Sequence, residues 1–501
     1  MKDSRLAMNP NKLVQYLEKP PEEFTKEDLI KFIEAHNIQM VNFRFVGGDG
    51  RLKTLNFVIT GRSQLDRLLS AGERVDGSSL FSYIDAASSD LYAVPRYKTA
   101  FVNPFAPIPT VDILCSYYTK DGNPLASSPE NVLRKAHEVL KGSTGLTLEA
   151  MGELEYYVLS GKQDLYPTKS QKGYQESSPF CKWETLRCEA MQAIAQAGGN
   201  IKYGHSEVGY ISGEEHDFEQ NEIEFVPVPV EDAADQIVVA RWVLRMIGYK
   251  YGVAVSFAPK IAVGHAGNGM HVHTRLMKDG KNVMVSDNGL TDIARKAVAG
   301  YLTLAPSLTA FGNTVPLSFL RLVPHQEAPT NICWGDTNRS VLVRVPLGWQ
   351  NVGGMIRDAN PQEKEASSEY SESQTVEFRC PDGSANVHFL MAGLAVAARH
   401  GLEMGDALEV AHKLYVDVNI FSSEHKGMQQ TLPQLPTSCW ESAECLLRDR
   451  HVYERDGVFP PLVVDGLART LKCYDDKDLS ERYYGKGDQI KRLVDEYLHQ
   501  S

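Results

Sequence analysis

The chain has no apolar stretch long enough to span a membrane, and its first ten residues show neither a hydrophobic signal segment nor an arginine-rich amphipathic character. Its eight cysteines include no Cys-x-x-Cys pair, which argues against a disulfide framework and against a structural zinc site. Positive charge is also in deficit, because 52 lysines and arginines face 64 aspartates and glutamates. These absences predict a cytoplasmic protein that binds neither membranes nor nucleic acids through bulk electrostatics.

The length of 501 residues, with a hydrophobic fraction of 43%, is enough for at least two packed domains. The formal net charge is −12. Such an acidic excess usually spreads over solvated surface. The alternative is that part of it consists of carboxylates gathered to hold cations. Composition leaves both interpretations open.

The N-terminal part of the chain shows the pattern of a small α+β unit. Residues 1–36 contain an amphipathic helical stripe that includes Leu29 and Ile33. A hairpin is predicted over 41–59, because apolar and polar residues alternate on both sides of a glycine-rich turn. After a short leucine-rich helix, residues 72–80 are predicted to form a loop.

A domain boundary is predicted at the turn-rich segment 120–124, because Ser128 and Pro129 then start a new helix. Beyond it, predicted strands are separated by long connections, and several carry charge on one face. This pattern favours a large α+β domain whose antiparallel sheet lines a cavity with its polar face. Strands are predicted over 146–159, 221–228, 253–258, 271–277, 341–346 and 375–380, helices over 129–140, 184–197, 231–250, 291–304 and 385–401, and an exposed loop over 360–374.

Two of the predicted strands carry glutamates at alternate positions. Glu153 and Glu155 lie in the segment GELEYY, and Glu222 and Glu224 lie in QNEIEF, with Glu207 upstream. Side chains two residues apart share one face of a strand, so each pair faces either solvent or a cleft. For a single pair taken alone, a solvated strand face is the commoner case.

A glycine-rich segment, GHAGNGMHVH at 264–273, places His271 and His273 on one face of a strand. Single histidines are mostly structural, but two histidines behind glycines are candidates for metal ligands or phosphate contacts. The segment is not a Walker loop, because no Gly-Lys-Ser/Thr follows it, and it is not a dinucleotide-binding fingerprint.

Four arginines follow, namely Arg321, Arg339, Arg344 and Arg379. The planar guanidinium group suits carboxylate and phosphate oxygens, and these arginines are interleaved with Glu327 and Glu377. A lattice of salt bridges is the alternative. Carboxylates and an occasional histidine hold the divalent ions that bridge phosphates, while arginines neutralise a transferring phosphoryl group. The whole set therefore suggests two-metal phosphoryl transfer.

Six of these segments, in this order, resemble the signature segments of the glutamine synthetase family, its bacterial type I class in particular. They are GELEYY, QNEIEF, GNGMHVH, RLVPHQEAPTN, NRSVLVRVP and VEFRCPDGSAN. The segment Val75 to Ser79 also resembles the DGSS loop of the family. The likeness extends over nearly the whole chain after the N-terminal extension.

The resemblance implies an α+β protein in which a helical extension of residues 1–36 precedes a β-grasp domain of residues 37–122. Residues 123–501 would form the catalytic domain, whose curved antiparallel sheet supplies half of a funnel-shaped site between subunits. The resemblance also implies a homo-oligomer of stacked hexameric rings. L-glutamate, ammonium and ATP would be the substrates, with two or more Mg²⁺ or Mn²⁺ ions in each active site.

Residue roles follow from the resemblance by matching positions in the motifs. The metal ligands would be Glu155, Glu207 and Glu222 for one ion, and Glu153, His271 and Glu377 for the other. His273 and Arg344 would contact ATP, Arg339 the transferring phosphoryl group, and Arg321, Arg379 and the backbone of Gly267 the glutamate. Asp76 and Ser79 of a neighbouring subunit, with Tyr174 and Glu207, would form the ammonium pocket. Asp76 would deprotonate ammonium, and Glu327 would shield the intermediate from water.

Three segments depart from the family pattern. The stretch 208–221 is predicted to be a lengthened loop. Ala266 stands where the family has an asparagine that helps to hold the amino acid, and Asn268 takes the place of a serine. Residues 373–375 replace basic residues that help to bind ATP phosphates in the family.

The resemblance implies a glutamine synthetase that ligates ammonia to L-glutamate through γ-glutamyl phosphate. A γ-glutamyl ligase for an organic amine, similar to γ-glutamyl-polyamine synthetases, is the alternative that Ala266 leaves open. The retained Asp76, Ser79, Tyr174 and Glu327 favour ammonia. A non-catalytic structural relative would have lost metal ligands, whereas all of the matched ligand positions are present.

Overall fold

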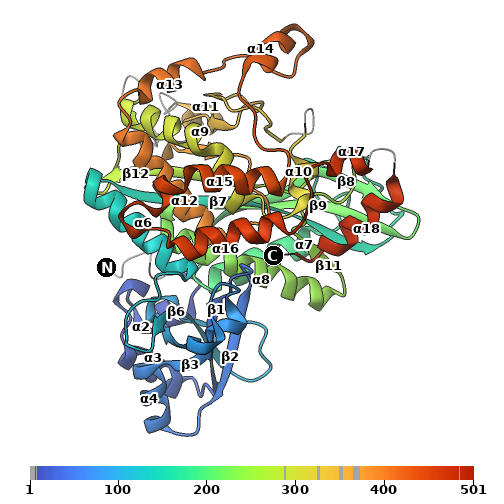
Figure 1. The fold of residues 1–501 in the computed structure, drawn as a ribbon. Coiled ribbons are helices and arrows are strands. Elements are labelled where there is room, and N and C mark those ends of the chain that lie inside the picture. Colours follow the sequence, from blue (N-terminus) through green and yellow to red (C-terminus); the bar gives the residue numbers. More distant parts are fainter. Residues whose placement is uncertain are drawn as a thin grey trace.

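The computed structural model describes residues 6, 8–286, 289–323, 328–348, 354–364, 373–483 and 486–500. Figure 1 shows a small N-terminal unit beside a larger one that contains the long strands and most of the helices. Within the described ranges, no helix combines the length and apolar character that crossing a membrane requires.

The N-terminal unit is a sheet of order β2-β1-β6-β4-β3, in which the central strands β1 and β6 run parallel. The predicted hairpin over 41–59 is confirmed, because β1 and β2 pair antiparallel. Leu13 and Ile30 of the N-terminal extension share one hydrophobic core with Phe43 and Ile113 of this sheet. The elements are α2 (Lys12–Leu17), α3 (Lys26–Ala35), β1 (Met40–Val46), β2 (Leu52–Val58), α4 (Arg62–Ala71), β3 (Glu73–Asp76), α5 (Gly77–Leu80), β4 (Asp90–Pro95), β5 (Phe101–Val102) and β6 (Thr110–Thr119).

The loop predicted over 72–80 is wrong, because β3 and the single-turn helix α5 occupy this segment. Val75 of β3 lies opposite Leu91 of β4. Asp76 caps α5 by accepting a hydrogen bond from the backbone N–H of Ser78 at 3.0 Å. The segment has too few apolar residues to show strand alternation, and its pairing with β4 decides its structure.

The larger unit is built on a sheet of order β16-β17-β18-β12-β7-β9-β8, antiparallel except between β16 and β17. On β7, Leu154 and Tyr156 belong to the hydrophobic core, while Glu153 and Glu155 alternate with them and face the other way. The strands are β7 (Thr147–Gly161), β8 (Ile201–Ser212), β9 (His216–Phe225), β10 (Val228–Pro229), β11 (Ala254–Ser256), β12 (Met270–Lys278), β13 (Lys281–Asn282), β14 (Val285–Ser286), β15 (Gly289–Leu290), β16 (Trp334–Asp336), β17 (Val343–Val345) and β18 (Val376–Phe378).

Helices cover the apolar face of this sheet (Figure 1). The strongly apolar α12 is buried along nearly its whole length and packs on α9 and α6. A Cβ at Gly300 of α9 would lie 1.9 Å from the carbonyl oxygen of Ala397, so glycine permits this close helix packing. The helices are α6 (Pro129–Thr144), α7 (Glu184–Gln196), α8 (Val230–Tyr251), α9 (Asp292–Gly312), α10 (Pro316–Arg321), α11 (Met355–Ala359), α12 (Val387–Glu403), α13 (Ala407–Lys413), α14 (Lys426–Thr431), α15 (Cys439–Glu454), α16 (Pro461–Lys472), α17 (Leu479–Tyr483) and α18 (Gly487–Tyr497).

The predicted strands and helices of this unit are confirmed with shifted ends, but the lengthened loop over 208–221 is wrong. The segment belongs to a hairpin in which β8 and β9 are joined by residues 213–215. Gly209 lies at an irregularity in the pairing, where a Cβ would lie 2.1 Å from Oη of Tyr157 and 2.4 Å from Oε1 of Gln220. This bulge interrupts the alternation that would have indicated a strand.

The exposed loop predicted over 360–374 is confirmed only in part. Residues 361–364 are exposed, whereas Gln374 is buried, and 365–372 lie outside the described residues.

Candidate active site

The polar face of the large sheet carries titratable side chains in rows, because the register places residues of neighbouring strands opposite one another. His271 on β12 lies opposite Glu153 on β7. Two residues further along β7, Glu155 lies opposite Glu222 on β9, which in turn lies opposite His205 on β8. Opposed side chains share one face of a sheet. The glutamate pair of β7 therefore faces a cleft, and the solvated strand face is wrong.

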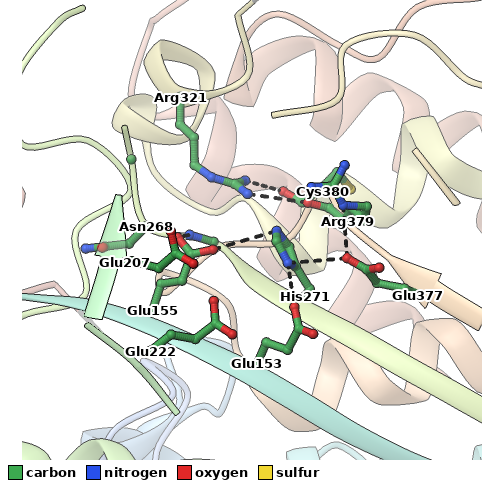
Figure 2. Close-up of polar contacts among 12 residues, drawn as sticks. Glu153, Glu155, Glu207, Glu222, Asn268, His271, Arg321, Glu377, Arg379 and Cys380 are labelled. Atoms are coloured by element: carbon green, nitrogen blue, oxygen red, sulfur yellow. Dashed lines mark hydrogen bonds and ion pairs between the residues drawn. The ribbon is translucent and has the colours of Figure 1, made fainter. Parts of the chain in front are cut away.

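Two histidines and two glutamates form one contact network on this face, and Figure 2 shows the part made by His271, Glu153 and Glu377. Nδ1 of His271 lies 2.8 Å from Oε2 of Glu153 and 3.5 Å from Oε1 of Glu377. Nε2 of His273 lies 2.9 Å from Oε1 of Glu153. Glu153, His273 and Glu377 each offer one atom, and these atoms lie within 4.8 Å of one another, which suits a bound cation.

Opposite charges keep the carboxylates of this network ionised. Burial acts to raise the pKa of Glu153, but His273 and His271 outweigh it and hold that pKa well below its usual range. Burial acts to lower the pKa of His273, and Glu153 reverses this and raises it. At Glu377, Arg379 likewise overcomes burial and lowers the carboxyl pKa. Ionised carboxylates are the form that binds a cation.

Arginine side chains surround Glu377 and the end of β18. Nη1 of Arg344 donates to Oε2 of Glu377 at 2.8 Å, and Nε of Arg379 donates to Oε1 at 2.9 Å. Arg379 also donates to the backbone carbonyl of Arg339. Arg321 donates to the carbonyl oxygens that follow β18 (Figure 2). The structure thus brings the predicted arginines to one place.

A second group of possible ligands consists of His205, Glu207 and Glu222, each offering one atom within 4.8 Å of the others. Nε2 of His205 lies 3.6 Å from Oε1 of Glu222, and its Nδ1 lies 3.8 Å from Oε1 of Glu207. Burial, followed by the charges of Glu153 and Glu155, raises the pKa of Glu222 well above its usual value. A divalent cation would relieve this repulsion.

Glu155 lies between the two groups and contacts the glycine-rich loop. Its Oε2 accepts hydrogen bonds from the backbone N–H of Gly269 at 2.8 Å and from Nε2 of Gln220 at 3.0 Å. Its Oε1 lies 3.9 Å from Nε2 of His271 (Figure 2). A Cβ at Gly269 would lie 2.6 Å from Nη2 of Arg321, so the loop needs glycine at this point.

Buried hydrogen bonds from Asn268 hold this loop in place. Its buried Nδ2 donates to the carbonyl oxygens of Ser256 at 3.2 Å and Ala258 at 3.0 Å. The hydroxyl of Tyr157 donates to the carbonyl of Ala266 at 2.8 Å. Ala266 lines the cavity above the sheet and Asn268 does not, so Ala266 is the position that can affect a bound substrate.

A cavity of about 1290 Å³ lies over this face of the sheet. Its volume exceeds that of a pocket for one drug-sized ligand, so it can hold more than one molecule. Of the predicted site residues, those that line it are Glu153, Glu155, Tyr174, Glu207, Glu222, Gly267, His271, His273, Arg321, Arg339, Arg344, Glu377 and Arg379. Carboxylates, histidines and arginines around one cavity can bind cations and neutralise phosphates.

Three predicted site residues are not brought to this cavity by the described chain. Asp76 and Ser79 lie exposed in the small unit, where Oγ of Ser79 donates to Oδ2 of Asp76 at 2.5 Å. Hydrogen bonds from Ser79, and then from Ser78, lower the pKa of Asp76. Glu327 lies outside the described residues.

Sequence reasoning missed residues that complete the two groups. His205 precedes Glu207 by two positions, and strand alternation could have placed both on one face. Oγ1 of Thr375 lies 2.9 Å from Nδ1 of His273, whereas the sequence indicates only that this position lacks a positive charge. Gln220 donates a hydrogen bond to Glu155. It lies two residues before Glu222, and strand alternation could have placed both side chains on one face of the sheet.

Two sequence profiles match the chain. "Glutamine synthetase, beta-Grasp domain" matches residues 37–120, and "Glutamine synthetase, catalytic domain" matches residues 126–470. The glutamine synthetase of Clostridium saccharobutylicum is 29% identical over 429 residues, which cover 84% of this chain and 88% of the relative. The glutamine synthetase of Pyrococcus furiosus is 30% identical over 427 residues, which cover 84% and 87%.

Solved structures share the fold. The cryo-EM structure of Plasmodium falciparum glutamine synthetase matches with a TM-score of 0.73 at 18% identity, over 93% of this chain and 98% of that one. The structure of GmaS without ligand matches with a TM-score of 0.71 at 18% identity, with the same coverage of 93% and 98%. The predicted fold class, a β-grasp unit beside a larger α+β unit with a curved sheet, is confirmed.

Proposed function

The chain belongs to the glutamine synthetase family of ligases, and from this premise we propose that it ligates ammonia to L-glutamate with ATP, giving L-glutamine, ADP and phosphate. One observation carries the proposal. Two groups of carboxylates and imidazoles lie on one concave sheet face beside the guanidinium groups of Arg344 and Arg379. Phosphoryl transfer to a carboxylate uses cation sites next to arginines in this way.

The two groups fit divalent cations by their chemistry. Carboxylate oxygens and imidazole nitrogens are suitable ligands for Mg²⁺ or Mn²⁺. The raised pKa of Glu222 indicates an excess of negative charge that a cation would neutralise. The proposed ligands are Glu153, His271 and Glu377 for one ion, with His273 beside them, and Glu155, Glu207 and Glu222 for the other, with His205 beside them. The ions would neutralise the phosphates of ATP.

The remaining residues would bind and orient the substrates. Hydroxide is a poor leaving group from a carboxylic acid, so the γ-carboxylate of glutamate first attacks the γ-phosphorus of ATP and becomes an acyl phosphate. Arg321 and Arg379 would hold glutamate, and Arg339 would stabilise the transferring phosphoryl group. Arg344 and His273 would hold the nucleotide.

Residues 373–375 lack the positive charge expected for phosphate binding. Lys202 and Arg275 line the same cavity and bring cationic groups from other strands. With Lys172, they are cationic residues of the described cavity lining that could supply the missing charge.

Ammonium would enter a pocket completed by a second subunit. Asp76 and Ser79 lie outside the cavity of their own chain, so we propose that they reach the cavity of a neighbour in a ring-shaped homo-oligomer. The lowered pKa of Asp76 suits it to bind the ammonium cation. Burial between subunits would raise that pKa and let Asp76 accept the proton before attack. Tyr174 and Glu207 would line the pocket on the other side, and Glu327 would shield the intermediate.

The test is phosphate release from ATP with glutamate and Mg²⁺ or Mn²⁺, comparing ammonium with a panel of organic amines. Stimulation by ammonium, with formation of glutamine, is expected. Stimulation by one amine and none by ammonium would overturn the proposal.

Asp76→Ala tests the second-subunit pocket. Ammonia-dependent turnover should fall by about 100-fold or more, because proton transfer contributes at this scale. ATP binding should change little, since the proposed role of Asp76 is to bind ammonium and accept its proton rather than to contact the nucleotide. Equal losses in turnover and ATP binding would contradict the assignment.

An organic amine remains a second candidate because of one observation. Tyr174 and Tyr203 line the cavity and contact His205, with ring centroids 5.3 Å and 5.9 Å away. Aromatic faces beside carboxylates attract organic ammonium groups. Tyr203→Ala should then weaken use of the amine while leaving ammonia-dependent turnover within about threefold.

A further inference from the structure

A second cavity, of about 430 Å³, lies where the two units of the chain meet. One wall comes from the hairpin of the small unit at Arg51, another from α8, and a third from the backbone around His499. Figure 1 shows α8 between the β1–β2 hairpin and the rest of the larger unit. The catalytic cavity shares no residue with this one.

The cavity is positively charged. Arg51, Arg241 and Arg245 line it, and neither aspartate nor glutamate is among its described lining residues. The guanidinium groups of these arginines donate hydrogen bonds to neutral acceptors. They are the carbonyl of His499 for Arg51, the carbonyl of Ala385 at 3.0 Å and Sδ of Met270 at 3.1 Å for Arg241, and the carbonyl of Gln500 at 3.3 Å for Arg245.

This concentration of positive charge is costly without an anion. Arg241 is only 3% exposed, and its Nε has no hydrogen-bond partner among the described residues. Burial and then the charge of Arg245 lower the pKa of Arg241 to about 9, against a weaker opposing effect of Asp382. Burial and then the charge of Arg51 lower the pKa of Arg245 to about 10. Buried charges normally have partners of opposite sign.

We propose that this cavity binds a small polyanion bearing carboxylate or phosphate groups, and that the bound anion links the β-grasp unit to the catalytic sheet. The fork of guanidinium donors matches either oxyanion. Leu52 and Val238 provide an apolar wall that suits an organic anion. The volume is suited to a molecule smaller than a dinucleotide.

The anion would also influence the catalytic face. Arg241 contacts Met270, which directly precedes His271 on β12. Ile237, one helical turn away on α8, lies against Gly152, which directly precedes Glu153 on β7. An anion that shifts α8 would therefore shift the two strands that carry one group of proposed metal ligands.

Binding is tested on the full chain after metal has been removed with EDTA and the chelator dialysed away, so that metal-dependent phosphate binding in the catalytic cavity is removed. Inorganic phosphate and citrate are titrated by calorimetry, with sodium chloride at matched ionic strength as the reference. The variants are Arg51→Gln, Arg245→Gln, the surface control Arg134→Gln and the catalytic-cavity control Arg339→Gln. The exposed Arg51 should tolerate substitution even if Arg245→Gln fails to fold.

Phosphate or citrate should bind to the wild type and to both controls, with affinity at least about tenfold weaker in Arg51→Gln and Arg245→Gln. Binding of phosphate alone indicates a phosphoester, and binding of citrate alone indicates a carboxylate; either supports the proposal. No binding beyond that of chloride, or binding lost in Arg339→Gln and kept in Arg51→Gln, would overturn it.

Coupling is tested by titrating Mn²⁺ with and without the anion. The affinity for Mn²⁺ should change by about fivefold or more, and Mn²⁺ should change the anion affinity by the same factor. The measured Mn²⁺ affinity does not depend on catalysis, so this test remains valid even if ammonia is not the substrate that reacts with the activated glutamate. An unchanged Mn²⁺ affinity at saturating anion would overturn the link to the catalytic sheet.

Discussion

His271 of β12 lies opposite Glu153 of β7, and its Nδ1 is 2.8 Å from Oε2 of that glutamate. The same carboxylate receives Nε2 of His273 at 2.9 Å through its other oxygen. Glu153 therefore positions both imidazole rings and keeps its charge by contact with them. One carboxylate on β7 thus sets the geometry of both imidazole rings on the neighbouring strand β12.

Glu153→Gln should remove this organisation. The amide lacks the charge that raises the pKa of His273, and one of its two polar atoms can no longer accept a hydrogen bond. We expect Mn²⁺ affinity and kcat/KM each to fall by about 100-fold or more. Glu149→Gln, on the same strand but outside the cavity lining, is the matched control and should stay within about threefold. Similar losses in both variants would indicate general damage to β7.

Glu222→Gln should stabilise the metal-free protein while impairing metal binding. Glu222 is buried against other carboxylates, so removing its charge removes repulsion. We expect the free energy of unfolding in EDTA to rise by about 1 kcal/mol. Stabilisation by saturating Mn²⁺ should shrink in the same variant. Thermal unfolding with and without metal measures both, and a destabilised metal-free variant would show that the carboxylate has a supporting partner.

The titration of His273 and Glu222 should lower stability as pH rises through neutrality when metal is absent, against an opposing effect of His400, whose pKa is lowered mainly by burial. The raised pKa of His273 gives stabilisation that is complete below its ordinary value of 6.5 and is lost as pH rises through the folded value. The raised pKa of Glu222 acts in the same direction, because the folded protein keeps a proton that the unfolded chain releases above 4.5. The pKa values of Glu153 and Glu377 are lowered, so the stabilisation that these carboxylates provide is lost only in acid, as pH falls below 4.5 and they become protonated.

Thermal unfolding in EDTA from pH 6 to pH 9 is the measurement. Saturating Mn²⁺ should remove the downward slope, because the ion competes with protons for the same groups. Glu222→Gln should flatten it in EDTA. A midpoint temperature of unfolding that rises with pH in EDTA would contradict this prediction.

Thr375→Val should remove the hydrogen bond to Nδ1 of His273 while keeping nearly the same side-chain volume at position 375. Oγ1 of Thr375 contacts Nδ1 at 2.9 Å and so selects the orientation of the ring. We expect KM for ATP to rise by about tenfold with a smaller change in kcat. Thr375→Ser keeps the hydroxyl and should restore the wild-type KM. If both variants behave alike, the hydroxyl does not orient the ring.

Gly209→Ala should distort the active-site loop from a distance. The new Cβ would lie 2.1 Å from Oη of Tyr157, whose hydroxyl donates to the carbonyl of Ala266. A loss of about 1–3 kcal/mol in stability is expected from such overpacking, with reduced activity. Tyr157→Phe removes the nearest of the crowding atoms and leaves Oε1 of Gln220 at 2.4 Å, so the double variant should recover part of the loss and be more stable than the sum of the two single changes predicts. Additive losses would show that another contact causes the strain.

The sequence predicted which candidate ligands share a strand face where strand alternation was visible. Glu153 with Glu155 and His271 with His273 each share a face, because a period of two residues carries this information. A single charged pair on a strand does not distinguish a cleft from a solvated face, and the segments that line one cavity could be recognised only because several of them occur together. The predicted fold class rested on the same alternation together with the family motifs.

The sequence could not show relationships that depend on register between strands. His205 joins Glu222 only because β8 pairs with β9 across a bulge at Gly209, and an irregular pairing leaves no periodic signal. The cavity lined by Arg51, Arg241 and Arg245 combines segments that are far apart in the chain. Such a group depends on how two units pack, which local patterns do not encode.

The rows of side chains on the large sheet also have a consequence for biosynthesis. The proposed ligands Glu155, Glu207 and Glu222 lie on β7, β8 and β9, so this group is complete once the chain has been made through β9. The other group includes Glu377 of β18 and is complete only after more than 150 further residues have been made. Long-range strand pairing is slow. One divalent ion could therefore stabilise a partly made sheet, whereas the other would stabilise only chains whose sheet is finished.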